Sequence, residues 1–292
     1  MPRSPLHTPL MGWYDDNARD LPWRDPAATS WAVMVSEFML QQTPVARVLP
    51  VYEAWIRRWP TPADLAAAPS GEAVRAWGRL GYPRRALRLH ASATVITAEH
   101  GGQVPADPAV LRGLPGVGDY TAAAIAAFAY GRRAVVLDTN IRRVFARAMS
   151  AREFPPPGSP SKAERAEAEQ LLPNSDIDAA HWSVAVMELG ALVCSASDPA
   201  CPTCPIAEQC AWLLAGRPAY DGPPRRGQTY AGTDRQCRGR ILGLVREADG
   251  PVSLNRIDLV WPDTRQRERC LASLVEDGLL APAGQAAYAL PD

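Results

Sequence analysis

The chain has 292 residues, 47% of them hydrophobic, and its 31 basic residues balance 31 acidic ones. This length allows two or three domains with cores of their own, and the lack of eighteen consecutive apolar residues argues against a transmembrane helix. A net charge of zero argues against a general polyanion-binding protein, although local basic clusters are compatible with nucleic-acid binding.

Helical patterns follow one another along most of the chain. Residues 1–28 are rich in Pro and Trp and are predicted to be irregular, whereas Ser30 caps an almost wholly apolar helix over 31–40. Thr43-Pro44 then marks the start of another helix. No segment before residue 280 alternates with period two, so the body is predicted to be all-α. Further helices are predicted at about 63–68, 71–80, 84–99, 107–113, 119–130, 138–149, 162–172 (with a Ser161–Glu164 capping box) and 179–194.

The C-terminal part reads as a separate small module. Residues 216–234 are rich in Gly, Pro and Arg and predict a linker. Helices at about 235–247, 253–260 and 264–278, followed by an extended end at 287–290, predict a winged-helix-like module. Its third helix carries three arginines, so the module could contact DNA or pack on a partner, and both readings stay open. These arginines are Arg265, Arg267 and Arg269.

Four cysteines lie within seventeen residues, in the pattern Cys194-x6-Cys201-x2-Cys204-x5-Cys210. Zinc modules usually pair two CxxC knuckles across a longer gap, whereas only one CxxC occurs here, so the spacing favours a 4Fe-4S cluster over zinc. Two disulfides are the ordinary alternative, but six cysteines in 292 residues and no signal peptide do not suit a secreted miniprotein. Free thiols at Cys237 and Cys270 agree with a reducing compartment.

A glycine-containing turn, Leu114-Pro115-Gly116-Val117-Gly118, connects a predicted helix to the Ala-rich helix that starts near Asp119. Two glycines let the backbone approach a ligand closely, and the following helix presents free N–H groups to it. The turn follows no strand and lacks a GK[ST] sequence, so a nucleotide-binding P-loop is not expected. We interpret it as a helix-hairpin-helix that holds a DNA backbone, with a plain αα-turn as the alternative.

Two carboxylates occupy unusual sequence positions. Glu37 is the only charge in the apolar helix 31–40, and Asp138 follows three apolar residues at a predicted helix start. Taken separately, Glu37 could face solvent and Asp138 could be an ordinary N-cap.

Basic residues cluster at 84–88 and 132–147. Each cluster fits a solvated helix face and a nucleic-acid surface equally well. These clusters comprise Arg84, Arg85, Arg88, Arg132, Arg133, Arg142, Arg143 and Arg147.

The motifs taken together resemble the helix-hairpin-helix DNA glycosylases with an iron–sulfur cluster. Over about residues 10–215 they occur in the order Trp23, Glu37-x-x-Leu40-Gln41-Gln42-Thr43, Leu80-Gly81-Tyr82, Leu114–Gly118, Asp138 and the four cysteines. Within that superfamily the chain is similar to the adenine DNA glycosylases of the MutY type. Three features favour this branch over endonuclease III: the segment Ser36–Thr43, Tyr120 in the place of the Schiff-base lysine, and Met187-Glu188-Leu189-Gly190.

The resemblance implies a fold and a set of residue roles. The expected fold is a six-helix barrel over 29–135, an iron–sulfur helical domain over 1–28 and 136–215, a linker over 216–234 and a winged-helix-like module over 235–292. Glu37 is implied as general acid and Asp138 as the ionised carboxylate beside the sugar, with Tyr120 and Asn140 orienting them. The adenine pocket is implied to include Arg19, Trp23, Arg24, Leu40 and Glu188. DNA contacts are implied for Gln41, Gln42, Thr43, Tyr82, Leu114, Gly116, Val117 and Gly118, and cluster ligation for Cys194, Cys201, Cys204 and Cys210.

The lysine content bears on the reaction independently of the resemblance. A glycosylase with lyase activity needs an amine nucleophile to form a Schiff base with the sugar. Lys162 is the only lysine, and it lies in a polar, capped helix outside every motif. We therefore expect a monofunctional hydrolase.

The expected function is excision of adenine mispaired with 8-oxoguanine or guanine in double-stranded DNA, by a cytoplasmic, nucleoid-associated monomer. A thymine/T·G mismatch glycosylase, an endonuclease III-like enzyme and a non-catalytic iron–sulfur DNA-binding protein are the alternatives. Relatives of this type carry a Nudix-like C-terminal domain that recognises 8-oxoguanine, whereas about sixty residues follow the linker here. The preference for the opposite base stays open.

Overall fold

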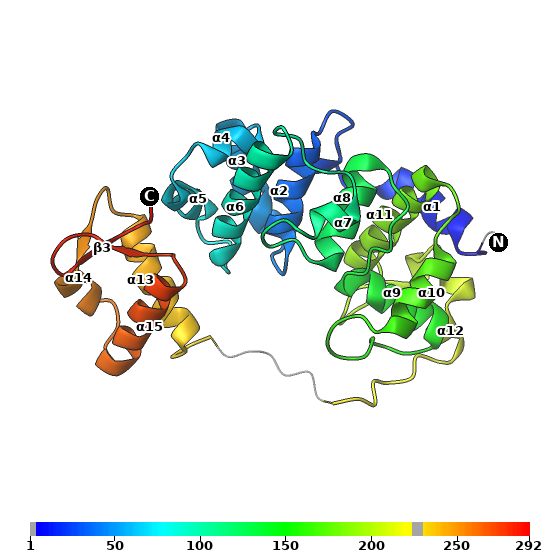
Figure 1. The fold of residues 1–292 in the computed structure, drawn as a ribbon. Coiled ribbons are helices and arrows are strands. Elements are labelled where there is room, and N and C mark those ends of the chain that lie inside the picture. Colours follow the sequence, from blue (N-terminus) through cyan, green and yellow to red (C-terminus); the bar gives the residue numbers. More distant parts are fainter. Residues whose placement is uncertain (1–3, 224–229) are drawn as a thin grey trace. The chain divides into compact units, whose positions relative to one another are not determined.

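The computed structural model describes residues 4–223 and 230–292. Within these ranges it contains fifteen α-helices, three short 3₁₀ helices and three short strands, which confirms the predicted all-α class (Figure 1). No helix in the described part of the chain is long and apolar enough to cross a membrane. Part of the predicted linker, residues 224–229, lies outside the described residues.

The chain forms two compact units, each made of discontinuous segments. The first contains Met1–Met34, Ala106–Gly113 and Val117–Pro224, and the second contains Val35–Pro105, Leu114–Gly116 and Arg225–Asp292. The long apolar helix α2 (Ser30–Leu40) supplies residues to both. The units are described separately below.

The first unit is built around the long helix α11. Helices α1 and α9 pack against α11, and α12 packs against α9. The helices of this unit are α1 (His7–Asn17), α7 (Pro108–Leu111), α8 (Asp119–Tyr130), α9 (Thr139–Ser150), α10 (Lys162–Leu171), α11 (Asp176–Leu192) and α12 (Ala211–Leu214), with 3₁₀ turns η1 (Pro22–Arg24), η2 (Cys201–Thr203) and η3 (Ala207–Gln209).

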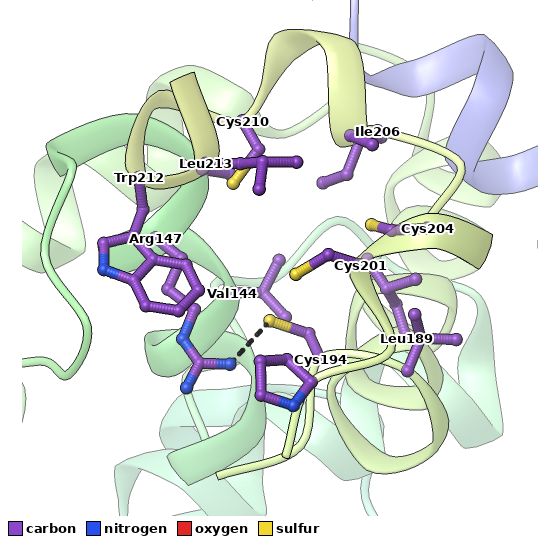
Figure 2. A pocket seen from close by; sticks show the side chains of 14 residues that line it. Val144, Arg147, Leu189, Cys194, Cys201, Cys204, Ile206, Cys210, Trp212 and Leu213 are labelled. Atoms are coloured by element: carbon purple, nitrogen blue, oxygen red, sulfur yellow. Dashed lines mark hydrogen bonds between the residues drawn. The ribbon is translucent and has the colours of Figure 1, made fainter. Parts of the chain in front are cut away.

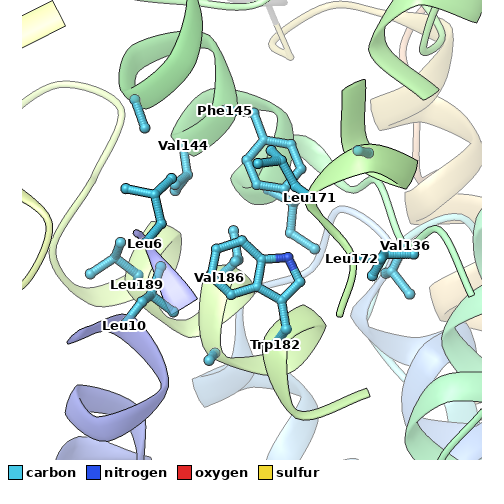
Figure 3. Close-up of a cluster of buried hydrophobic side chains, with 14 of the residues drawn as sticks. Leu6, Leu10, Val136, Val144, Phe145, Leu171, Leu172, Trp182, Val186 and Leu189 are labelled. Carbon is cyan, nitrogen blue, oxygen red and sulfur yellow. The ribbon is translucent and has the colours of Figure 1, made fainter. Parts of the chain in front are cut away.

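A large apolar core joins α1, α8, α9, α10 and α11 (Figure 3). Trp182 of α11 is fully buried in it, stacked near Phe145 of α9 and edge-on to His7 of α1. The His7 Nε2 atom lies 2.7 Å from the Leu171 carbonyl oxygen, so this buried polar ring has a hydrogen-bond partner. Burial of this apolar area fixes the direction of α9, which carries several of the candidate site residues.

The prediction that residues 1–28 are irregular was wrong for α1. Its sequence, HTPLMGWYDDN, contains a proline and a glycine that weaken any helical pattern. Pro9 is tolerated because it lies in the first turn, where the backbone N–H would have no intrahelical acceptor. The buried Leu6 and Leu10 then hold the helix on the core. The capping box predicted at Ser161 and Glu164 is present at the start of α10.

The second unit combines a helical part with the C-terminal module. In the helical part α4 and α5 pack on α6, and Trp55 and Trp77 meet edge-to-face with ring centroids 5.7 Å apart. Its helices are α3 (Val45–Arg58), α4 (Pro62–Ala66), α5 (Ser70–Trp77), α6 (Arg84–Glu99), α13 (Asp234–Arg246), α14 (Leu254–Asp258) and α15 (Thr264–Glu276), and its strands are β1 (Val252–Ser253), β2 (Ala281–Pro282) and β3 (Ala287–Ala289).

The C-terminal module has the arrangement of a winged helix. Helix α13 packs on α15, and the strands form an antiparallel sheet in the order β1-β3-β2, with Tyr288 opposite both Val252 and Pro282. The sequence predicted the three helices and the extended end near β3, whereas strand β1, which lies before residue 280, was not predicted. Strand β1 has two residues, too few for a period-two pattern to be visible.

The module docks on α5 within the second unit. The Gly71 N–H donates to the Pro291 carbonyl at 2.8 Å, and a Cβ at Gly71 would lie 2.2 Å from that oxygen, so only glycine fits here. The Arg75 guanidinium donates to the carbonyls of Arg246 and Ala248 at the end of α13. These contacts fix the position of α13 on the helical part of the unit.

Candidate active site and metal centre

The four closely spaced cysteines line one cavity in the first unit (Figure 2). Cys194 follows α11, Cys201 begins η2, Cys204 follows η2, and Cys210 caps α12. Apolar side chains from α9, α11 and the cysteine loop complete the lining, among them Val144, Leu189 and Ile206. The structure therefore brings together all four residues that the spacing selected.

A buried cation lies against this cavity. Arg147 of α9 is 2% exposed, and its Nη1 atom donates to Cys194 Sγ at 3.3 Å and to the Ser195 carbonyl at 2.7 Å. Its guanidinium carbon lies 4.8 Å from the Trp212 ring centroid. Among the described residues Arg147 has no carboxylate partner. Since a buried charge is stable only when it is compensated, the cysteine site is the place where negative charge is expected.

The thiols themselves are poorly placed to ionise without a metal. Burial raises the pKa of Cys194, although Arg147 opposes this effect, and burial raises the pKa of Cys204 to about 11. Within the described residues no three His, Cys, Asp or Glu side chains converge on a single-ion position. Four thiols that line one cavity are a donor set of the kind that an iron–sulfur cluster takes.

Asp138 is the N-cap of α9, at the opposite end of the helix from Ser150. Its Oδ1 atom accepts a hydrogen bond from the Ile141 N–H at 2.6 Å, and its Oδ2 atom accepts one from Asn140 Nδ2 at 3.0 Å. The pKa of Asp138 lies above its ordinary value because burial outweighs these hydrogen bonds and the nearby Arg143 charge, which lower it. Both carboxylate oxygens face donors, which offset part of the cost of burying the anion.

One arginine connects this carboxylate to the cysteine loop. Arg143 Nη2 donates to Asn140 Oδ1 at 2.9 Å and to the Gly190 carbonyl at 2.6 Å, and its Nε atom donates to the Cys194 carbonyl at 2.7 Å. A Cβ at Gly190 would lie 2.8 Å from the Asn140 Cβ atom, so glycine is required for this close approach. Asp138 is thereby held by a continuous hydrogen-bonded chain that ends at the Cys194 carbonyl, beside the cysteine-lined cavity.

A second charged cluster forms around Glu188 of α11, which is fully buried. Arg19 donates to Glu188 through Nε at 2.7 Å, Nη2 at 2.7 Å and its backbone N–H at 3.1 Å, and Arg24 Nη2 adds a bond of 2.8 Å. Burial alone would disfavour the charged form, but these donors lower the pKa of Glu188 to about 2. Glu188 is therefore ionised at neutral pH, and its oxygens are occupied by the two arginines.

In the second unit the Glu37 side chain is buried, as the apolar sequence around it predicted. It is 5% exposed, and its neighbours Phe38 and Met39 are completely buried. A carboxyl side chain in such surroundings is a functional candidate rather than part of a solvated face.

Two loops of the second unit carry residues in strained backbone conformations. Gln42, after α2, has φ +55°, and Tyr82, before α6, has φ +48°. Non-glycine residues rarely adopt this region, and such strain persists only where surrounding contacts impose it. Both residues are among those expected to contact DNA.

Arg85 of α6 supplies contacts that join the two loops. It is 6% exposed, and burial lowers its pKa to about 10. Its Nη1 atom donates to the carbonyls of Phe38 at 2.9 Å and Gln41 at 2.6 Å, and Nη2 donates to Thr43 Oγ1 and the Gly81 carbonyl, both at 3.2 Å. One guanidinium thus fixes the loop at Gln42 and the loop at Tyr82.

The glycine-containing turn lies between α7 and α8. Gly116 has φ +81°, and a Cβ there would lie 2.8 Å from the Arg88 Cβ atom, so the residue must be glycine. Ser92 Oγ donates to the Pro115 carbonyl at 2.6 Å and holds the turn on α6. Gly118 is the N-cap of α8 and, as a glycine, supplies no side-chain cap to the first N–H groups of that helix.

The structure assigns the remaining candidates to the two units. Trp23 is buried in η1, directly before Arg24, which donates to Glu188. Tyr120 on α8 packs against the core of the first unit. Leu40 lies with Glu37 at the end of α2 in the second unit. Leu114 and Val117 are buried in the turn between α7 and α8.

The sequence missed the importance of several arginines. Neither of the two alternatives for the basic clusters, a solvated helix face or a nucleic-acid surface, fits Arg85, Arg142, Arg143 and Arg147, which are all buried. Arg142 pairs with Glu164 at 2.7 Å, and the others hold loops or the wall of the cysteine-lined cavity. Local charge cannot distinguish these positions from surface ones. The only available signal is the spacing of 143 and 147, which places both on one face of a helix.

Comparison with known proteins agrees with this geometry. Residues 35–173 match the HhH-GPD superfamily of base excision DNA repair proteins. The chain is 52% identical over 292 residues to an adenine DNA glycosylase of Mycobacterium tuberculosis, covering 99% of this chain and 95% of that protein. It is 49% identical to the adenine DNA glycosylase of Mycolicibacterium smegmatis, covering 96% and 94%. Among solved structures, a thermostable thymine-DNA glycosylase superposes with a TM-score of 0.64 at 25% identity, over 72% of this chain and 95% of that one.

Proposed function

The chain belongs to the adenine DNA glycosylases of the HhH-GPD superfamily and is a base excision repair glycosylase, and from this premise we propose that it hydrolyses the N-glycosidic bond of adenine mispaired with 8-oxoguanine or guanine. The observation that carries the proposal is the anchored carboxylate Asp138, whose two oxygens accept hydrogen bonds at 2.6 and 3.0 Å. A carboxylate fixed in this way, with an acid elsewhere on a buried helix, is the pair that glycosidic hydrolysis needs.

The proposed chemistry divides the work between the two carboxyl groups. Adenine is a poor leaving group as an anion, so Glu37 protonates a ring nitrogen as general acid while the bond breaks. The sugar becomes an oxocarbenium-like cation, which the ionised Asp138 stabilises on one face. Asn140, bonded to Asp138 Oδ2, fixes the carboxylate, and Tyr120 helps to orient the attacking water. Water then adds to the sugar, and an abasic site remains.

The adenine pocket is proposed to include Arg19, Trp23, Arg24, Leu40 and Glu188. Because Glu188 is saturated by hydrogen bonds from the two arginines, its part is to hold them in fixed positions. The guanidinium groups, which are less buried than Glu188, then present their remaining N–H donors to the base.

A hydrolytic rather than a lyase reaction is supported by the position of the only lysine. Lys162 is exposed in the first turn of α10, a helix that contributes no other candidate site residue. A Schiff base with the sugar requires an amine next to the reacting carbon, and a desolvated one is favoured. We therefore propose that strand cleavage is absent.

DNA engagement is proposed to use the backbone turn and the two strained loops. The turn 114–118 offers glycine-lined backbone and the N-terminus of α8 to phosphates. Gln42 and Tyr82, with Gln41 and Thr43 beside them, enter the base stack and hold the strand when adenine is flipped out. Fixing both loops through Arg85 lowers the ordering cost of that insertion.

The metal centre is proposed to be a 4Fe-4S cluster held by Cys194, Cys201, Cys204 and Cys210. When bound, the cluster cross-links the cysteine loop to the end of α11 and compensates the buried charge of Arg147. The chain's own contribution is the hydrogen-bonded path from that loop through Arg143 to Asp138. The division into an iron–sulfur domain and a six-helix domain, and a monomeric state, belong to the same proposal.

The proposal is tested with duplexes that contain A·8-oxoguanine, A·G, T·G or thymine glycol, each incubated with the protein and then split into two samples. One sample is treated with hot alkali and the other is not. Cleavage of the adenine strand only after alkali is the expected result. Release of thymine from T·G alone would assign the chain to thymine mismatches, and strand scission without alkali would show a lyase.

A further inference from the structure

A stack of exposed aromatic and cationic side chains lies where the C-terminal module meets the loop of Tyr82. Tyr82 is 47% exposed, and the guanidinium carbon of Arg235, in the first turn of α13, lies 5.3 Å from its ring centroid. The same guanidinium lies 5.7 Å from the ring of Tyr230, which is 52% exposed. The guanidinium carbon of Arg85 lies 5.4 Å from the Tyr82 ring centroid. The ring of Tyr82 therefore contacts both a buried and an exposed arginine.

Arg235 differs from Arg84 and Arg238 at this junction because it has no carboxylate partner among the described residues. Arg84 of α6 and Arg238 of α13 both pair with Asp277, at 3.0 and 2.5 Å, and the Arg84 pair joins α6 to the module. Within the described part of the chain Arg235 makes no ion pair. Ordering an exposed, unpaired cation next to two exposed tyrosines costs side-chain entropy and adds little to stability. The group is suited to bind nucleic acid, whose phosphates attract the cation and whose bases stack on the rings.

Helix α15, the third helix of the module, is less suited to contact DNA, although a winged-helix arrangement would assign the contact to it. Arg267 of α15 is buried and pairs with Asp258 at 2.8 Å, and Arg269 pairs with Asp234 at 2.8 Å. Only Arg265 on this helix is exposed and without an ion pair among the described residues. The charge of α15 is largely neutralised inside the module.

We propose that Arg235, stacked between Tyr82 and Tyr230, extends the DNA-contact surface onto the C-terminal module, with the strand opened at Tyr82 as its ligand. The tyrosine faces stack on unpaired bases, and the guanidinium binds the adjacent phosphate. The inference deepens the proposed function, since it depends on Tyr82 entering duplex DNA. Contact with the opened strand is then made by the first turn of α13, and no Nudix-like domain is required.

The experiment compares Arg235→Ala with Arg265→Ala in the full-length chain. Both residues are exposed arginines of the same module, so the second variant removes the same charge from the expected recognition helix. Affinity is measured against salt concentration for a duplex with a tetrahydrofuran abasic-site analogue opposite 8-oxoguanine. This probe opens the helix without requiring catalysis. Matched melting temperatures of the two variants show that both are folded.

Arg235→Ala is expected to weaken binding about fivefold or more and to reduce the slope of log affinity against log salt by about 1, whereas Arg265→Ala changes neither. Unchanged affinity and slope for Arg235→Ala, or a loss confined to Arg265→Ala, would overturn the inference. Adenine release by the wild-type chain is measured in parallel. Its absence would refute the proposed function without affecting the comparison of the two arginines.

Discussion

The surroundings of α9 and the two strained loops at Gln42 and Tyr82 use buried arginines in different ways. Around α9, Arg143 and Arg147 close a hydrogen-bonded network in which Asp138 and Cys194 are both held. In the loops, Arg85 fixes the backbone while the ring of Tyr82 stays exposed. The hydrogen bonds around α9 fix the side chains of the proposed reaction centre, whereas Arg85 fixes only the loop backbone and leaves the Tyr82 ring exposed for a ligand.

The largest expected effect concerns the acid of the reaction centre. Glu37→Gln keeps the size of the side chain but removes the transferable proton, so single-turnover excision of adenine should fall by about 10³-fold or more. Binding to the mispaired duplex should persist. Glu53→Gln, at an exposed position of α3, is the matched control and should excise at the wild-type rate. Unchanged excision by Glu37→Gln would remove Glu37 from the acid role.

Removing the buried cation should have the next largest effect. Arg147→Leu leaves the charge of the metal centre uncompensated, and we expect a loss of about 3–5 kcal/mol in unfolding free energy together with loss of bound iron. Iron content, visible absorbance and melting temperature report this outcome. Arg152→Leu, at an exposed residue two positions after α9, should keep all three. Full iron loading and an unchanged melting temperature in Arg147→Leu would contradict the role of this arginine.

The Glu188 cluster predicts a particular response to acid. The pKa of Glu188 falls from an ordinary value of 4.5 in the unfolded chain to about 2 in the fold, so its stabilisation is present above about pH 4.5 and is lost as the pH falls towards 2. The difference corresponds to about 3 kcal/mol. Unfolding of Glu188→Gln should therefore depend less steeply on pH in this window than unfolding of the wild type. If the unfolding free energies of Glu188→Gln and of the wild type fall equally steeply between about pH 4.5 and 2, the cluster contributes little to stability.

The smallest expected effect lies in the loops. Arg85→Gln loses most of the hydrogen bonds to the loops at Gln42 and Tyr82, and we expect about tenfold weaker binding to a mispaired duplex with little change for undamaged DNA. Arg57→Gln, an exposed arginine on α3, is the control. An equal loss on both duplexes would indicate a general electrostatic effect instead of a role in positioning the loops.

Much of the fold and of the site followed from local sequence. The Ala-rich run at 119–130, the caps at Ser161 and Asp138 and the cysteine spacing each specify a local feature, and the structure contains them. Glu37 was selected because an isolated charge in an apolar helix is costly, and its burial agrees.

The rest depends on contacts between distant segments. Helix α1 is weak as a sequence pattern and is stabilised by its packing on α11. Arg85, Arg143 and Arg147 look like surface residues because none of their acceptors is a carboxylate: most are backbone carbonyls, and the others are a hydroxyl, an amide oxygen and a thiol, which have no sequence signature. Strand β1 is defined only by its pairing with β3.

The central claim is that Glu37 and Asp138 act on the same adenine nucleotide, and a double-mutant cycle tests it most directly. Single-turnover excision from an A·8-oxoguanine duplex is measured for Glu37→Gln, Asp138→Asn and the double variant. Residues that act as one unit are strongly non-additive, so the double variant should be little slower than the slower single variant. A double variant whose rate loss equals the product of the two single losses would show that the two carboxyl groups act independently, and would contradict the account.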